Sequence, residues 1–316
     1  MTTFDTQGIA VRPGQKIIWS ASPTPFLENG TLDTASLQQA VDQHVRLGVT
    51  GLFVGGTCGE GPLMPNGQRA ELVRTVKRLA GSRMHVAAQV SDTSAARVRE
   101  NILCMQDAGA DSVVIAPPWI TRFCTAEFVR RYFYESIEAA TVPVGIYVLK
   151  QPDGSAPDLA TWKELAGHPR VRFVKDSSAS ADYIRSLGEL KRKRPNLVVQ
   201  TGYEFDVISA IDGGYDGALL GTGILIGGMI RRALDALAAG DRAAADAWQK
   251  RSNEFLWDLF SRDLRIWLGG LKYALVRLGI FRSEFMHLSY PLADADRARV
   301  DAAIEREREF ICPGKI

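Results

Sequence analysis

The sequence predicts an α/β fold, a (β/α)₈ TIM barrel with a C-terminal helical extension. Short apolar segments alternate with longer amphipathic segments along most of the chain. Strands that alternate with helices of this length pair in parallel, because each connection between them is helical. About eight such units over roughly 230 residues match a closed barrel. An open doubly wound sheet is the alternative, but the Gly-x-Gly-x-x-Gly fingerprint is missing after the first strand.

The first half of the chain contains four strand–helix units. Strands are expected at 16–21, 51–55, 84–90 and 112–116, and helices at 34–47, 67–79, 94–108 and 126–140. A Thr or Asp cap opens the helix 34–47. In the helix 67–79 the apolar residues recur at helical spacing and form one face, made of Leu72, Val73, Val76 and Leu79.

The second half repeats the pattern and then departs from it. Strands are expected at 143–148, 171–174, 197–201 and 217–221, and helices at 159–167, 181–193, 204–212 and 229–239. The segments 242–259, 264–278 and 294–308 then have helical patterns with no strand between them. We therefore expect residues 1–226 to form the barrel, and residues 227–316 to form the last barrel helix and a C-terminal helical appendage.

Composition and charge are those of an ordinary soluble protein. Of the 316 residues, 46% are hydrophobic and 23% charged, and 38 basic against 36 acidic residues leave a net charge of +2. This balance gives no reason to expect nucleic acid or a membrane surface as a partner. The basic run 191–194 precedes Pro195 and is expected to end a helix, where cations suit the dipole. No secretory signal or membrane span is recognisable, so we expect a cytoplasmic protein.

The metal-binding residue types are scattered. Neither the cysteines nor the histidines show the paired spacing of a disulfide framework or a zinc site; they are Cys58, Cys104, Cys124, Cys312, His44, His85, His168 and His287. The glycine-rich segment 55–61 lacks the Gly-Lys-Ser/Thr ending of a phosphate-binding loop. We therefore expect no metal and no cofactor.

Lys175 follows the apolar strand 171–174 and is the first candidate catalytic residue. Burial disfavours the charged form of a lysine, because the ammonium loses its hydration. A neutral amine can attack a ketone and form a Schiff base. The alternative is a structural lysine whose charged end extends to solvent from the end of a strand.

Two other strand ends add polar groups on the side of the barrel where active sites lie. The second strand leads into Gly55-Gly56-Thr57-Cys58-Gly59-Glu60, whose glycines let backbone N–H groups face a carboxylate and whose Thr57 adds a hydroxyl. The fifth strand ends near Tyr147, whose phenol can transfer a proton. A glycine turn and a half-buried core tyrosine are the structural alternatives. An amine, a phenol and an anion-binding turn together suit Schiff-base chemistry on a 2-oxo acid.

These segments resemble the dihydrodipicolinate synthase / N-acetylneuraminate lyase family over nearly the whole chain. The segment 51–60 is similar to the family's Gly-Thr-Thr-Gly-Glu signature, and Val174-Lys175-Asp176-Ser177-Ser178 follows in the family's order and approximate spacing. Segments 201–202, 216–221 and 271–279 resemble its last two strands and C-terminal helices. The resemblance implies a Schiff-base enzyme of the pyruvate type on a (β/α)₈ barrel, and a homo-oligomer, either a tetramer or a dimer.

The resemblance also implies residue roles. Lys175 would form the Schiff base, Tyr147 would transfer protons, and Thr57 would link Tyr147 to solvent or substrate. Thr57 and the backbone amide of Cys58 would hold the carboxylate of the 2-oxo acid. The further candidate contacts to substrate are Gly56, Leu219, Trp119 and Lys150.

The departures from the family pattern bear on the substrate. Cys58 stands where many members have a second threonine. Trp119 stands where the synthases have a tyrosine that a neighbouring subunit lends to proton transfer, and an indole donates but cannot pass a proton. Pro152 stands at about the position of an arginine that binds the second substrate of the synthases, although Lys150 is close in sequence. These changes argue against true dihydrodipicolinate synthase activity.

The expected function is therefore aldol cleavage of a 2-keto-3-deoxy sugar acid to pyruvate and an aldehyde. The pair Pro117-Pro118 before an aromatic residue resembles the 2-keto-3-deoxy sugar acid dehydratases and aldolases. The alternatives are dehydration of such an acid, a condensation like that of 4-hydroxy-tetrahydrodipicolinate synthase, and a relative that binds a 2-oxo acid without turnover. Specificity for the aldehyde half is expected in the loops near 117–123 and 150–155.

Overall fold

The protein is a closed parallel barrel with helices around it. The computed structural model describes residues 16–119, 124–149 and 156–314. In these ranges eight strands close into one barrel in chain order, and the last strand pairs with the first. The strands are β1 (Ile17–Ala21), β2 (Gly51–Val54), β3 (His85–Gln89), β4 (Ser112–Ile115), β5 (Val144–Val148), β6 (Val171–Asp176), β7 (Val198–Thr201) and β8 (Gly217–Leu220). The predicted fold class is confirmed.

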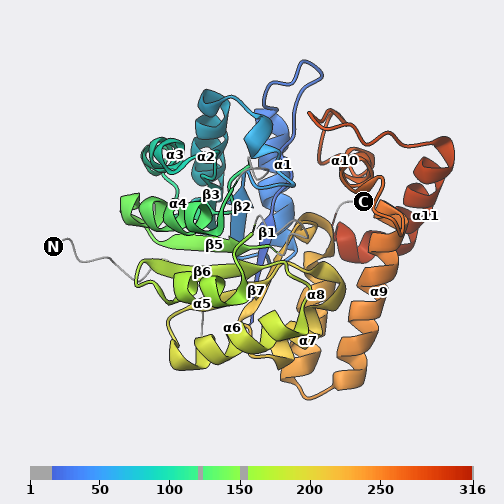
Figure 1. Ribbon diagram of the computed structural model, residues 1–316. Coiled ribbons are helices and arrows are strands. Elements are labelled where there is room, and N and C mark those ends of the chain that lie inside the picture. The colour runs from blue at the N-terminus through green and yellow to red at the C-terminus, as the bar shows by residue number, and fades with distance from the viewer. Residues whose placement is uncertain (1–15, 120–123, 150–155, 315–316) are drawn as a thin grey trace.

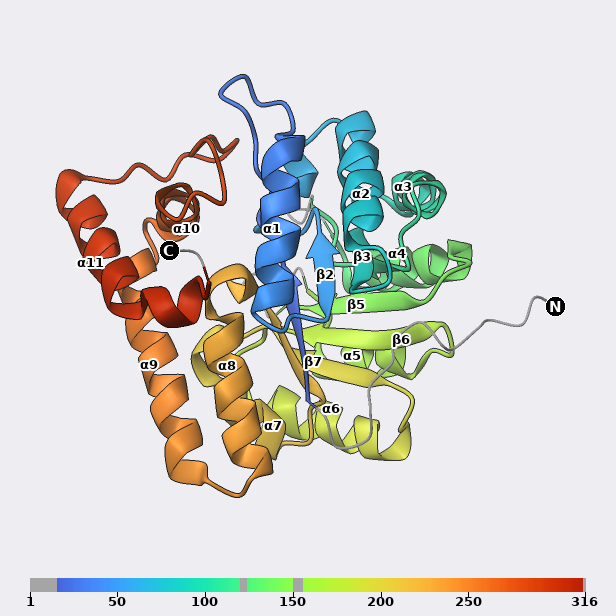
Figure 2. The same ribbon diagram turned by 180° about the vertical axis from the view of Figure 1, so that it is seen from behind.

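A helix follows each strand and packs on the outside of the barrel, as Figures 1 and 2 show from opposite sides. The helices are α1 (Thr34–Arg46), α2 (Asn66–Ala80), α3 (Ala95–Asp107), α4 (Ala126–Ala139), α5 (Leu159–Gly167), α6 (Ala181–Lys193), α7 (Val207–Asp212) and α8 (Gly223–Ala238). Two short 3₁₀ turns, η2 (Gly61–Leu63) and η3 (Glu204–Asp206), precede α2 and α7. The predicted segment 204–212 is thus a 3₁₀ turn followed by a short α-helix.

The strands bury both of their faces, which explains their nearly continuous apolar sequences. One set of side chains fills the inside of the barrel and includes Trp19, Phe53, Phe173 and Leu219. The other set packs between the sheet and the helices. Gly145 is required in the inner layer, because a β-carbon there would lie 2.2 Å from the Phe173 ring.

The C-terminal segment forms three further helices, α9 (Arg242–Phe260), α10 (Trp267–Arg277) and α11 (Asp294–Ile311). Helix α9 packs along α8, and α10 and α11 pack against α9. Both views show this group on one side of the barrel (Figures 1 and 2). These helices overlap the three segments 242–259, 264–278 and 294–308 in which the sequence predicted helices.

The last barrel helix begins earlier than the sequence suggested. It starts at Gly223 and not at residue 229, so the expected division after residue 226 falls inside α8. Gly227 and Gly228 lie within this helix because it packs closely on its neighbours. A β-carbon at Gly227 would lie 3.0 Å from Val49 Cγ2, and one at Gly228 would lie 3.1 Å from the Phe310 carbonyl oxygen.

Helix α10 begins later than expected, at Trp267 and not at residue 264. Ser261 has a φ of 65° and Leu264 a φ of 59°, both in the left-handed region. A right-handed helix cannot continue through such residues. These two positions lie in the connection between α9 and α10, so the start of α10 falls after Leu264, which the apolar pattern alone did not reveal.

Candidate active site

Lys175 and Tyr147 lie side by side inside the barrel. They are register partners on β6 and β5, so both side chains leave the sheet on the same face. Lys175 Nζ lies 4.0 Å from the centroid of the Tyr147 ring and 5.6 Å from that of Phe53. Lys175 is 5% exposed and Tyr147 is 8% exposed. Among the described residues Lys175 forms no ion pair, and the rings of Tyr147 and Phe53 lie beside its amine.

The end of β7 makes room for the lysine side chain. Lys175 pairs with Gln200 on β7, and Gly202 follows two residues later. A β-carbon at Gly202 would lie 2.6 Å from Lys175 Cε and 2.2 Å from Ser177 Oγ. Only glycine therefore fits at position 202 without displacing the Lys175 side chain.

The glycine-rich turn after β2 is wound tightly. Gly55 has a φ of 67° and Glu60 a φ of 55°, and the Glu60 N–H donates to the Thr57 carbonyl at 3.2 Å. A β-carbon at Gly61 would lie 1.9 Å from the Gly55 carbonyl oxygen. The Thr57 side chain is exposed at the outside of this turn, and Cys58 is half-buried.

A buried ion pair holds this turn against the C-terminal helices. Lys272 Nζ on α10 lies 2.5 Å from Glu60 Oε1, and both side chains are fully buried. The His287 N–H donates to Glu60 Oε2 at 2.6 Å, and Lys272 also donates to the Phe285 carbonyl at 2.7 Å. Burial lowers the pKa of Lys272, while the charge of Glu60 acts in the opposite direction. Sequence reasoning missed this pair, because its members are 212 positions apart.

Glu204 is a second buried carboxyl group that the sequence did not suggest. It begins η3, just after β7, and both of its oxygens accept hydrogen bonds from Thr222, the residue before α8. Burial raises the pKa of Glu204, and the Thr222 hydrogen bonds and the charge of Lys175 act against this rise. Burial also raises the pKa of the Cys58 thiol to about 12, so Cys58 is a neutral thiol at ordinary pH. The only sequence signal for Glu204 was its position after a strand end.

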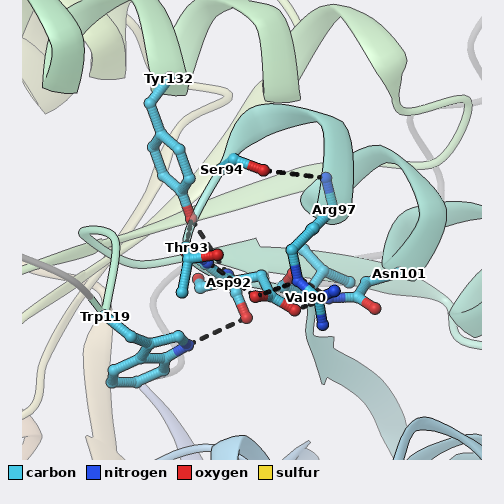
Figure 3. Close-up of polar contacts among 9 residues, drawn as sticks. Val90, Asp92, Thr93, Ser94, Arg97, Asn101, Trp119 and Tyr132 are labelled. Carbon is cyan, nitrogen blue, oxygen red and sulfur yellow. Dashed lines mark hydrogen bonds and ion pairs between the residues drawn. The ribbon is translucent and has the colours of Figure 1, made fainter.

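Trp119 lies in a polar cluster on the β3 side of the barrel (Figure 3). Its indole N–H donates to the Ser91 carbonyl at 3.0 Å. The neighbouring Asp92 accepts hydrogen bonds from Arg97 at 2.7 Å and Asn101 at 3.1 Å. Trp119 is 39% exposed and helps to line a hollow of about 370 Å³ that also borders Asp92 and Arg97. Its N–H is donated within the chain, and its contact with a substrate stays a prediction.

The remaining predicted site residues have different surroundings. Leu219 is fully buried in the apolar cluster inside the barrel, which also contains Tyr147. Gly56 is buried in the turn, where a β-carbon would lie 2.7 Å from the Phe53 ring. In the described ranges the Thr57 hydroxyl makes no hydrogen bond, so its link to Tyr147 stays a prediction. Lys150 and Pro152 lie outside the described residues.

Across residues 16–119, 124–149 and 156–314, no three His, Cys, Asp or Glu side chains come together in a way that could hold a metal ion. None of the helices in this part of the chain is both long enough and apolar enough to span a bilayer.

Sequence comparison identifies a family. A model of the dihydrodipicolinate synthetase family matches residues 15–307. The chain is 28% identical to 4-hydroxy-tetrahydrodipicolinate synthase 1 of Streptomyces coelicolor over 278 residues, which are 88% of each chain. It is 29% identical to the 4-hydroxy-tetrahydrodipicolinate synthase of Aromatoleum aromaticum over 285 residues, which are 90% of this chain and 95% of that one.

Solved structures share the fold. Dihydrodipicolinate synthase DapA-2 of Bacillus anthracis superposes with a TM-score of 0.82 at 22% identity, covering 92% of this chain and 97% of that one. The prophage protein YagE of Escherichia coli K12, solved with pyruvate, gives 0.82 at 24% identity over 94% and 99%. N-acetylneuraminate lyase of Mycoplasma synoviae gives 0.80 at 19% identity over 93% and 98%. This chain belongs to the dihydrodipicolinate synthase family and is a lyase on a (β/α)₈ barrel.

Proposed function

We propose that this lyase cleaves a 2-keto-3-deoxy sugar acid to pyruvate and an aldehyde, with Lys175 as the Schiff-base residue. The observation that carries the proposal is the pair of Lys175 and Tyr147. A buried amine that forms no ion pair among the described residues lies 4.0 Å from the centre of a tyrosine ring. Such an amine can attack a carbonyl, and the phenol beside it can exchange a proton with the reacting groups.

The chemistry follows from these two side chains. The Lys175 amine attacks the C2 carbonyl of the substrate, Tyr147 gives its proton to the departing hydroxyl, and the loss of water leaves a protonated imine and a Tyr147 phenolate. The phenolate accepts the proton of the C4 hydroxyl while the C3–C4 bond breaks and its electron pair moves into the imine, forming an enamine. The aldehyde is released. Protonation of the enamine at C3 and hydrolysis of the imine then give pyruvate and the free lysine.

The glycine-rich turn is the proposed site for the C1 carboxylate. Thr57 and the backbone N–H of Cys58 would donate to it, at the end of β2. The Glu60–Lys272 pair supports this role, because it fixes the turn from the side of α10. A rigid turn presents its N–H groups without losing further conformational freedom when the substrate binds.

A dehydratase is the second candidate. The same imine makes the proton at C3 acidic, and loss of the C4 hydroxyl from the resulting enamine would release water. The early steps are shared, so Lys175 and Tyr147 suit both reactions. The two differ in product, because only cleavage gives free pyruvate.

The synthase reaction named for the relatives is the third candidate. Those relatives are under 30% identical to this chain. Trp119 argues against the synthase reaction, because its N–H donates to the Ser91 carbonyl and an indole cannot pass a proton. Pro152 also offers no positive charge for a second anionic substrate.

The experiment is a panel of 2-keto-3-deoxy sugar acids, assayed with lactate dehydrogenase and NADH. We expect NADH oxidation with at least one acid and not with the Lys175→Ala variant. Loss of the substrate without pyruvate formation would instead assign the dehydratase reaction. Formation of 4-hydroxy-tetrahydrodipicolinate from pyruvate faster than any sugar acid is cleaved would contradict the proposal in favour of the synthase.

We further propose a homo-oligomer, a tetramer or a dimer, in the cytoplasm, with a small 2-oxo acid as its substrate. Neither nucleic acid nor a membrane is expected as a partner, given a net charge of +2. Light scattering of the purified protein measures the oligomeric state.

A further inference from the structure

A hollow of about 620 Å³ lies between the end of α9 and helix α11, among the C-terminal helices beside the barrel (Figures 1 and 2). Three arginines line it, which are Arg262, Arg299 and Arg306. Arg299 and Arg306 are about two turns apart on α11, so they lie on the same face of that helix. Arg262 comes from the connection after α9. Three guanidinium groups from two segments of the chain thus meet at one hollow.

Arg262 is held over an aromatic ring and has no counter-charge. Ser261 has a φ of 65°, which ends α9 and turns the chain. The Arg262 Cζ atom then lies 5.8 Å from the centroid of the Trp257 ring, which also lines the hollow. Within the part of the chain that the structure describes, Arg262 forms neither an ion pair nor a hydrogen bond. Its charge is therefore available to a ligand.

Arg299 and Arg306 are fixed from behind by buried carboxylates. Arg299 Nη2 donates to Asp296 at 2.8 Å and its Nε to the Asp258 carbonyl at 3.0 Å. Arg306 Nε donates to Glu307 at 2.9 Å and its Nη2 to the Asp258 carboxylate at 2.9 Å. Asp296 is 1% exposed and Glu307 is 2% exposed. In the described ranges the Nη1 groups of both arginines make no hydrogen bond, so two oriented donors remain.

The two carboxylates in the wall of the hollow already have cationic partners. Glu254 pairs with Lys250 at 3.4 Å, and Asp258 pairs with Arg306 at 2.9 Å. Neither is therefore an unpaired negative charge that would repel an anion. Arg262 is the cation without such a partner among the described residues, so the hollow as a whole favours a negatively charged ligand.

We propose that this hollow binds a phosphate group, either free phosphate or the phosphate of a small ester. Guanidinium groups are suited to phosphate because their planar N–H donors match its oxygens and form charge-assisted hydrogen bonds. Three such groups around one space suit a tetrahedral dianion, and the anchored pair on α11 loses little freedom when the ligand binds. The site shares no residue with the Lys175–Tyr147 site, so it does not depend on the proposed reaction.

The test is equilibrium dialysis of the whole chain against inorganic phosphate and, separately, glycerol 3-phosphate. A chloride buffer of low ionic strength limits screening. We expect one bound anion per chain, with half-saturation at about 1 mM or lower. Similar affinities would show that the phosphate group alone is recognised, whereas clearly tighter binding of the ester would identify an organic phosphate as the ligand. Both results support the site.

Variants locate the bound anion. Arg262→Gln and Arg306→Gln should each weaken binding by about 10-fold, the loss expected for one hydrogen bond to a charged group. Arg306→Gln leaves Glu307 paired with Arg251 at 2.7 Å, so the buried carboxylate keeps a partner and the fold is retained. The matched control is Arg308→Gln, which removes the same charge from another face of α11 and should not change the affinity.

Three outcomes would overturn the inference. The first is the absence of saturable binding of either anion up to about 10 mM. The second is equal weakening in Arg308→Gln, because net charge and not the hollow would then attract the anion. The third is full affinity in both Arg262→Gln and Arg306→Gln, which would place the phosphate elsewhere on the chain. None of these results bears on imine formation at Lys175, which the borohydride adduct tests separately.

Discussion

Lys175 and Lys272 are both buried close to the turn formed by residues 55–60, and they differ in what surrounds the amine. Lys272 is fully buried and lies 2.5 Å from Glu60. Lys175 is 5% exposed and lies against the rings of Tyr147 and Phe53, with no carboxylate paired to it among the described residues. Similar burial thus accompanies two different electrostatic settings.

These surroundings indicate a structural role for Lys272 and a catalytic role for Lys175. The Lys272 amine is held by the Glu60 carboxylate and the Phe285 carbonyl, so it is not free to attack a carbonyl. The Lys175 amine forms no ion pair among the described residues and lies against the Tyr147 ring, so it is available to react with a ketone. The comparison predicts that changes at Lys175 affect chemistry with little effect on stability, and that changes at Lys272 do the reverse.

The largest expected effect is that of Lys175→Ala on turnover. Without the amine no imine forms, and we expect the rate to fall by about 10³-fold or more. The urea midpoint should stay close to that of the wild type, because no ion pair is broken. Turnover that survives this substitution would move the chemistry to another residue.

Lys272→Met should mainly lower the free energy of unfolding. It leaves Glu60 buried without its partner, and breaking such a pair costs about 3–5 kcal/mol. Adding Glu60→Gln removes the second charge but keeps an acceptor for the His287 N–H, so the double variant should regain part of the loss. Urea unfolding of the four proteins in this cycle measures the effect. Equal stability of the single and double variants would contradict the ion-pair explanation.

His44 tests whether a buried side chain with only neutral hydrogen-bond partners stays uncharged in this protein. Its ring is fully buried and contacts the Ala40 carbonyl and the Ser20 hydroxyl. Burial lowers the pKa of His44 to about 4, against about 6.5 in the unfolded chain. The contribution to stability is therefore complete above pH 6.5 and is lost as the pH falls towards 4, by about 3 kcal/mol.

The measurement for His44 is urea unfolding at pH 7 and at pH 4, for the wild type and for His44→Gln. The variant has no ring to protonate, so it should lose less stability over this range. An identical pH dependence in the two proteins would contradict a neutral buried His44.

Tyr147→Phe should have the smallest effect of the four. It keeps the ring that lies against Lys175 and removes only the hydroxyl. We expect the borohydride adduct with pyruvate to persist while turnover slows by about 10²-fold, the usual contribution of a general acid–base group. Steady-state kinetics and intact mass measure the two quantities on the same sample. Full turnover in this variant would remove Tyr147 from the proton transfer.

The barrel was predictable because its signal is local. Each strand is a short apolar run and each helix has its own apolar face, so alternation along the chain was sufficient. The predicted starts of α8 and α10 were wrong because backbone conformation and close packing, and not the apolar pattern, determine where these helices begin. Leu264 has a positive φ that no composition rule anticipates, and Gly227 and Gly228 allow close helix packing inside α8, which crosses the expected division after residue 226.

The candidate site was partly predictable for the same reason. Lys175 and Tyr147 end strands, and strand ends meet at one face of a barrel. The Glu60–Lys272 pair joins residues 212 positions apart, and the contact of Glu204 with Thr222 depends on how η3 approaches α8. Such pairings depend on three-dimensional proximity and leave no periodic pattern in the sequence.

The most direct test is to locate the pyruvate adduct on the chain. The protein is incubated with pyruvate and borohydride, digested, and its lysine peptides are mapped by mass. The account predicts one modified residue, Lys175, with Lys272 unmodified in the folded protein. Modification of Lys272, or a folded protein in which Lys175 stays free at saturating pyruvate, would contradict it.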